Sequence, residues 1–287
     1  MAQVSASIQP YRLHLPERLS SGVVFASPHS GRFYPADFTR RAQLDLLRLR
    51  SSEDAFVDRL LTQVPQAGAT LIEAVYPRAF VDLNRAEDEL DPALIEGVTR
   101  GSGGARVLTG LGVIPRVVAG GREIFRGKIP RAEAEDRLAR IWRPYHGQLA
   151  ALLQDRRARF GRALLFDVHS MPSEAASGGG PGPEIVLGDR FGASARAETS
   201  LAVEQAFRRA GLRVARNSPF AGAYVAQRYG RPAEGVEVLQ IEIARALYMD
   251  EERIEPLPGF DRFAQAIGAV FVELADLIRG EARLAAE

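Results

Sequence analysis

The sequence contains no cysteine and almost no lysine, since Lys128 is the only lysine among 37 basic residues. The absence of cysteine excludes disulfide bonds, zinc sites built from thiolates, and cysteine nucleophiles. No apolar run approaches the roughly 20 residues that cross a bilayer, and residues 1–16 lack the apolar core of a signal peptide. We therefore expect a cytoplasmic protein without a membrane partner.

An excess of charge of either sign is also missing. The 37 basic and 36 acidic residues leave a formal net charge of +1. A protein with so small a charge has no overall field that attracts nucleic acid, so we expect no nucleic-acid partner. Any charged ligand must instead be bound by local groups.

What is present is an ordinary globular composition, 46% hydrophobic and 25% charged over 287 residues. Short apolar runs alternate with longer segments of helical periodicity, which is typical of an α/β fold with a buried sheet. No repeat or linker divides the chain, so we predict one domain over residues 1–287. Strands are predicted at residues 22–26, 70–76, 80–83, 163–168, 184–187, 212–215 and 236–243. Helices are predicted at residues 35–49, 55–66, 131–160, 194–210 and 260–284, with Pro144 kinking or dividing the third.

Two glycine-rich stretches, residues 101–104 and 178–183, do not have the spacing of a phosphate-binding loop. Glycine in such clusters is typical of turns, so we interpret both as surface loops. The second directly follows a segment that contains a histidine, and an active-site loop is the alternative there.

Two of the four histidines lie just after predicted strands, His29 in Ala-Ser-Pro-His-Ser-Gly and His169 in Phe-Asp-Val-His-Ser-Met-Pro. The carboxyl end of a strand is where an α/β sheet presents side chains to a ligand. Either histidine alone would more often be structural, but two in the same setting favour a functional pair.

Without thiolates, a catalytic zinc site needs imidazole and carboxylate ligands, and two histidines with one acid suffice. Asp54 and Glu53 stand at the start of a predicted helix, where an acid is equally explained by the helix dipole. Asp167 lies two residues before His169. It either hydrogen-bonds that imidazole or is tied to backbone amides at the strand end.

Glu242 lies near the end of the most regular predicted strand, within a mostly apolar run. Burying an unpaired carboxylate there is costly, so Glu242 needs a cation, a metal-bound water or a raised pKa. A glutamate so placed suits the general base of a metal hydrolase. An internal ion pair with Arg245 is the structural alternative.

Arginine binds carboxylates through a planar fork, and Asn84-Arg85 directly follows a predicted strand. Arg126, in a loop flanked by glycine, is a further candidate for binding a carboxylate or stabilising an oxyanion. His146 follows Pro144-Tyr145 within the long predicted helix, where it either lines the site or packs at the kink.

Seven groups of residues, in order along the chain, resemble the N-formylglutamate amidohydrolases. They are Pro28-His29-Ser30-Gly31, Glu53-Asp54 with Val57-Asp58 and Leu60, Val81-Asp82-Leu83-Asn84-Arg85, Pro144-Tyr145-His146, Asp167-Val168-His169-Ser170-Met171-Pro172, Val186-Leu187-Gly188, and Leu239-Gln240-Ile241-Glu242-Ile243 with Leu247-Tyr248-Met249. They extend from residue 28 to about residue 252 and so cover most of the chain.

The resemblance implies a mixed central sheet flanked by helices, similar to the zinc carboxypeptidases, and one Zn²⁺ ion. It implies hydrolysis of N-formyl-L-glutamate to formate and L-glutamate, a step of histidine degradation. By similarity His29, Asp54 and His169 hold the metal, and Glu242 is the general base. Asn84 and Arg85 bind a substrate carboxylate. Glu53 remains the rival of Asp54, because 25 positions separate His29 from Asp54, whereas the first histidine and the acid lie very close together in the carboxypeptidases.

Two other functions stay open. The first is a related zinc deacylase or carboxypeptidase that acts on another N-acyl amino acid or a short peptide; Ala223 stands where a second glycine is expected in this family. The second is a binding protein that has lost catalysis, which the presence of Glu242 beside both histidines opposes.

Overall fold

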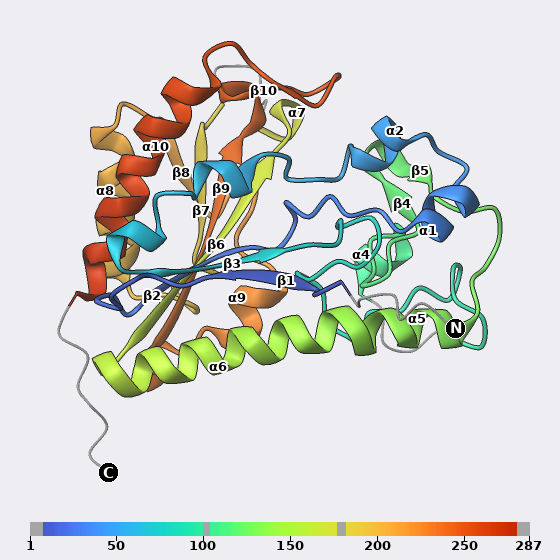
Figure 1. Cartoon of the computed structure of the whole chain (residues 1–287), viewed down its shortest axis with the longest axis horizontal. Helices are drawn as coiled ribbons and strands as arrows, with labels where there is room; N and C mark the ends of the chain where they lie inside the picture. The colour runs from blue at the N-terminus through green and yellow to red at the C-terminus, as the bar shows by residue number, and fades with distance from the viewer. Residues whose placement is uncertain (1–7, 100–103, 177–181, 280–287) are drawn as a thin grey trace, which may run out of the picture.

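A seven-stranded sheet forms the centre of the computed structural model, which describes residues 8–99, 104–176 and 182–279 (Figure 1). The strand order is β1-β3-β2-β6-β9-β7-β8. The strands are β1 (Tyr11–His14), β2 (Val23–Ser27), β3 (Thr70–Ala74), β6 (Ala163–Met171), β7 (Ile185–Gly188), β8 (Val214–Arg216) and β9 (Val236–Ala244). Strands β3, β2, β6 and β9 are parallel, whereas β1 and β7 pair antiparallel with β3 and β9. The predicted mixed sheet is confirmed.

Helices cover both faces of this sheet, because the central strands are apolar on both sides. Phe25 and Phe166 pack on one face against α3 (Val57–Leu60), α8 (Ala197–Arg209) and α10 (Phe260–Ala275). Val24 and Leu165 point to the opposite face, as alternation along a strand requires. That face is covered by α5 (Arg131–Arg137), α6 (Arg143–Phe160) and α9 (Tyr224–Tyr229). The result is a three-layer α/β/α arrangement.

The remaining elements are short. The helices are α1 (Ala36–Arg41), α2 (Leu46–Arg50), α4 (Ala105–Leu108) and α7 (Ser173–Ala176), and the strands are β4 (Val117–Val118), β5 (Arg122–Glu123), β10 (Met249–Asp250) and β11 (Glu255–Pro256). Single 3-10 turns lie at Pro65–Ala67, Ala119–Gly121, Pro232–Glu234, Arg245–Leu247 and Asp276–Ile278. In Figure 1 α1, α2, α4, β4 and β5 gather at the right.

One predicted strand is absent, and one strand of the central sheet was not predicted. Residues 80–83 form a turn, because Phe80 and Val81 donate their amides back to Pro77 and Asp82 donates to Val113. The apolar side chains of this segment are buried, which explains the strand-like pattern. Strand β1 was not predicted, because a four-residue strand at the sheet edge carries little pattern of its own.

Three predicted helices differ in detail. Residues 35–49 form two helices, because the side chain of Asp45 accepts a hydrogen bond from the amide of Arg48 and caps the start of α2. Residues 55–66 contain only the single turn α3, followed by a 3-10 turn that begins at Pro65. Pro144 does not divide the long helix. A π-helical segment, Leu138–Trp142, joins α5 to α6, and the two run in line in Figure 1.

Parts of other predictions lie outside the described residues. These parts are residues 101–103 and 178–181 of the glycine-rich stretches, and residues 280–284 of the last predicted helix. Among the helices of the described ranges, none has the length and apolar character that a membrane span requires.

Two glycines give a paired test of how tightly the segment after β2 is packed. A Cβ on Gly31 would lie 2.2 Å from the carbonyl oxygen of Tyr76, whereas a Cβ on Gly147 would have no neighbour within 4 Å. We expect Gly31→Ala to lower the free energy of unfolding by about 1–3 kcal/mol through overpacking. Gly147→Ala, in the interior of α6, should raise it by about 0.5–1 kcal/mol. Urea unfolding measures both, and equal effects would contradict the close packing at Gly31.

Candidate active site

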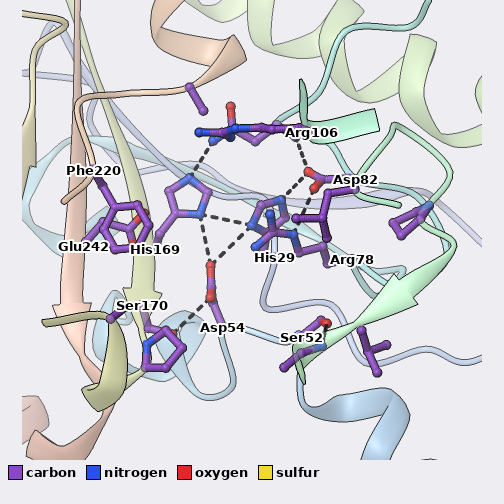
Figure 2. A pocket seen from close by; sticks show the side chains of 18 of the residues that line it. His29, Ser52, Asp54, Arg78, Asp82, Arg106, His169, Ser170, Phe220 and Glu242 are labelled. Atoms are coloured by element: carbon purple, nitrogen blue, oxygen red, sulfur yellow. Dashed lines mark hydrogen bonds and ion pairs between the residues drawn. The ribbon is translucent and has the colours of Figure 1, made fainter. Parts of the chain in front are cut away.

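Three ligand atoms from distant parts of the sequence meet at the carboxyl ends of the parallel strands (Figure 2). His29 follows β2, His169 lies within β6, and Asp54 lies in the segment between α2 and α3. The Nδ1 atoms of the two histidines are 3.1 Å apart. Oδ2 of Asp54 lies 3.0 Å from Nδ1 of His169 and 3.4 Å from Nδ1 of His29. All three side chains are buried.

The other nitrogen of each imidazole faces a buried carboxylate. Nε2 of His29 lies 2.7 Å from Oδ1 of Asp82, and Nε2 of His169 lies 2.9 Å from Oδ2 of Asp167. A neutral imidazole donates from one nitrogen only, so these carboxylates assign the proton to Nε2. Both Nδ1 lone pairs therefore point at each other and at Asp54. Of the two roles open to Asp167, the geometry favours the imidazole partner.

Such a cluster fits a cation. With both imidazoles neutral and protonated on Nε2, three acceptor atoms meet there, so the cluster requires a positive charge, which either a bound cation or a proton on Nδ1 of an imidazole supplies. Ligand atoms about 2.0–2.2 Å from a tetrahedral zinc lie about 3.3–3.6 Å from one another, near the observed spacings of 3.0, 3.1 and 3.4 Å. Two imidazoles and one carboxylate are also a donor set that zinc accepts in catalytic sites.

The pKa of His169 reflects the same demand for positive charge. Burial alone would lower this pKa, but the carboxylates of Asp167 and Asp54 outweigh burial and raise it well above its ordinary value.

Asp54, not Glu53, belongs to this cluster. The carboxylate of Glu53 accepts the hydroxyl of Tyr34 at 2.7 Å and Nε of Arg50 at 3.2 Å, and it takes no part in the group around the histidines. The amide of Asp54 donates to the carbonyl of His29 at 3.0 Å. That hydrogen bond brings the acid beside the histidine despite the 25 positions between them.

Glu242 lies in the same cavity, paired in register with His169 on the neighbouring strand. Burial raises the pKa of Glu242 to about 7. Nε2 of Gln240 donates to Oε1 of Glu242 at 2.7 Å, and Oε1 of Gln240 accepts the amide of Ala223 at 2.9 Å. The proposed ion pair between Glu242 and Arg245 is absent from the described residues, because Arg245 binds Asp54.

Asn84 and Arg85 both line this cavity of about 690 Å³. Nδ2 of Asn84 lies 3.3 Å from Oδ2 of Asp167, and Oδ1 of Asn84 accepts the amide of Val225 at 2.8 Å. Arg85 donates from Nε to the carbonyl of Leu111 and from Nη1 to that of Asn84. These carbonyls fix the plane of its guanidinium.

Arg126 is not brought to the cavity. It is exposed in the loop after β5 and is not among the residues that line the site. Arg78 and Arg106 lie there instead, and neither was singled out from the sequence. Arg78 donates to Asp82 at 2.9 Å. In the sequence, only the position of Arg78 four residues before Asp82 indicated that it belongs to the site. No feature of the sequence indicated this for Arg106, which lies on α4.

Comparison with known proteins identifies the family to which the chain belongs. A model of the N-formylglutamate amidohydrolase family matches residues 21–249. The N-formylglutamate deformylases of Pseudomonas aeruginosa and Pseudomonas putida are 32% and 30% identical, each over 88% of this chain and over 91% and 90% of their own lengths. The crystal structure of N-formylglutamate amidohydrolase from Ralstonia eutropha has a TM-score of 0.89 and 37% identity, covering 94% of this chain and 99% of that one.

His146 packs beneath the site and does not line it. Its Nε2 lies 3.0 Å from the carbonyl of Leu83, and its Nδ1 lies 2.9 Å from the hydroxyl of Tyr229. Burial and the nearby Arg228 lower the pKa of His146 to about 3. The neutral ring thus joins α6 to the turn that carries Asn84 and Arg85.

This histidine should make stability depend on pH. Its pKa in the folded protein is below the ordinary value of 6.5, so its contribution is complete above pH 6.5 and is lost as the pH falls toward 3. From pH 6.5 to pH 5 the loss is about 2 kcal/mol. His146→Gln removes this titration, so urea unfolding of the variant and wild type should converge as the pH falls. Parallel curves would contradict the buried neutral histidine.

Proposed function

Because the chain belongs to the N-formylglutamate amidohydrolase family, we propose that it hydrolyses N-formyl-L-glutamate to formate and L-glutamate with one Zn²⁺ ion. The observation that carries this proposal is the buried group of His29, Asp54 and His169 in one cavity with Glu242. We propose as its setting the cytoplasmic degradation of histidine, as the family resemblance implies.

His29 and His169, through Nδ1, and Asp54, through Oδ2, would hold the metal. When bound there, zinc polarises the formyl carbonyl and lowers the pKa of a water molecule toward about 7. Asp82 and Asp167 keep the Nε2 protons in place, which leaves both Nδ1 lone pairs available.

Glu242 acts as the general base and then as the general acid. It takes a proton from the attacking water and transfers it to the leaving amine nitrogen. A pKa of about 7 suits both directions of transfer. Oε1 of Glu242 already accepts a hydrogen bond from Gln240, so Oε2 is the oxygen that carries the proton.

The substrate carries two carboxylates, and the cavity offers two cations for them. We assign one to Asn84 and Arg85, whose Nη2 has no partner among the described residues. We assign the other, the side-chain carboxylate, to Arg106, which is exposed and forms no ion pair with the described part of the chain. Arg78, held by Asp82, takes the oxyanion role first considered for Arg126.

A related zinc deacylase acting on another N-acyl amino acid or short peptide is the second candidate. The size of the cavity favours it, since about 690 Å³ lies within the range that accommodates drug-sized ligands. The two candidates differ in the acyl group and side chain that the enzyme prefers.

The direct test is release of formate from N-formyl-L-glutamate by purified, metal-analysed protein. We expect turnover that is lost when a chelator removes the metal and restored by one equivalent of zinc. Glu242→Gln keeps the volume of the side chain and should bind zinc normally, yet react about 10²–10⁴-fold more slowly. Preference for acetyl or succinyl amino acids would favour the second candidate, and an undiminished rate in Glu242→Gln would remove this residue from the mechanism.

The role of Arg106 is tested by comparing two arginines. Arg106→Met should raise KM for N-formyl-L-glutamate about tenfold, because a charge-assisted contact to a carboxylate is lost. Arg126→Met, which changes an exposed arginine outside the cavity, is the matched control and should leave KM unaltered. N-formyl-L-glutamine lacks the side-chain carboxylate, so its KM should not respond to Arg106→Met. An equal loss with both substrates would refute the assignment.

A further inference from the structure

Arg245 links the end of β9 to the segment that carries Asp54. It begins the 3-10 turn after β9, and its side chain is 9% exposed. Nε donates to Oγ of Ser170 at 3.0 Å, and Nη1 donates to the carbonyl of Ser51 at 3.3 Å. Nη2 donates to the carbonyl of Glu53 at 2.7 Å and to Oδ1 of Asp54 at 3.2 Å. All three nitrogens of the guanidinium are therefore used.

The two oxygens of Asp54 have different surroundings. Oδ1 accepts from Arg245 and from Oγ of Ser170 at 3.1 Å, whereas Oδ2 faces the two imidazoles. Asp54 lies on no strand or helix. Its backbone is held by its amide bond to His29 and by the amide of Val57, which donates to its carbonyl at 3.3 Å, and the contacts above hold its carboxylate. The carboxylate is thereby oriented with one oxygen toward the histidines.

We propose that Arg245 is a positioning residue for the metal site, which fixes Asp54 as a ligand through Oδ2 alone. The inference rests on the metal site of the proposed function. A guanidinium is a rigid planar fork that holds several acceptors at once, which a lysine ammonium does not. Ser170, on the strand that carries His169, completes the link between Arg245 and Asp54.

The positive charge of Arg245 does not explain why an arginine stands beside the proposed metal ligand Asp54. A cation beside a metal ligand repels a divalent ion, so by electrostatics alone Arg245 would weaken metal binding. Its benefit must come from geometry. Arg245→Lys keeps the positive charge and removes the fork, so it separates the two effects.

The test measures zinc affinity by competition with a chromogenic chelator and uses no substrate. We expect Arg245→Lys to raise the dissociation constant about 10–100-fold, as loss of partners of metal ligands does elsewhere. Arg162→Lys is the matched control, because Arg162 also binds a buried carboxylate, Glu237 at 2.8 Å, but at the opposite end of β6. It should leave zinc affinity unchanged. In cobalt-loaded protein, Arg245→Lys should weaken the visible absorption bands, because Oδ1 loses one of its two donors and can then join the coordination.

Wild-type affinity and wild-type cobalt bands in Arg245→Lys would overturn the proposal, as would an equal loss of affinity in Arg162→Lys. If Arg245→Lys does not fold, Ser170→Ala is the second variant, because it removes one donor to Oδ1 of Asp54. It should also raise the dissociation constant for zinc, and wild-type affinity in Ser170→Ala would refute the proposal. Zinc binding is measured without N-formyl-L-glutamate. A wild type that binds zinc but releases no formate would defeat the proposed function and leave this inference standing.

Discussion

Three hydrogen-bond acceptors directed at one point are the constraint on which the site depends. Asp82 and Asp167 accept hydrogen bonds from Nε2 of the two imidazoles, so with both rings neutral Nδ1 of each meets Oδ2 of Asp54 without a proton between them. In a buried place this arrangement is stable only around a positive charge. The need for a cation therefore arises from residues behind the cluster as much as from the three residues that form it.

The sheet and the loops position these groups in different ways. His169 and Glu242 lie on adjacent parallel strands in register, and His29 follows the strand on the other side of β6. Their side chains are placed by backbone pairing over a long stretch of strand. Asp54 has no strand of its own, so side-chain contacts from Arg245 and Ser170 supply the rigidity that pairing gives elsewhere.

Both signs of charge line the cavity. Asp82 and Asp167 lie behind the imidazoles, and Glu242 lies beside His169 with its pKa raised by burial. Among the arginines of the cavity, Arg78 is paired with Asp82 and Arg245 with Asp54, whereas Arg85 is held by backbone carbonyls. The proposed metal cation and dianionic substrate would thus each meet groups of the opposite sign in one space.

Much of the fold and the site could be predicted from the sequence, because the signals were local. Alternation in Val236–Ala244 indicated a strand and placed Gln240 and Glu242 on one face. Histidines after apolar runs predicted a site at strand ends, and His29 and His169 do meet. The turn at residues 80–83 had the composition of a strand, because burial selects apolar side chains whatever the backbone does.

The sequence by itself determined the residue types, and hence the chemistry available: imidazole and carboxylate ligands in place of thiolates, and arginine as the cation for carboxylates. Only the tertiary structure decided which members of each type meet. It chose Asp54 over Glu53, brought Arg78 and Arg106 to the cavity and left Arg126 outside, and joined Arg245 to Asp54. Those choices depend on where loops fold back on the sheet. Such folding is set by contacts between residues far apart in the chain, which no local pattern records.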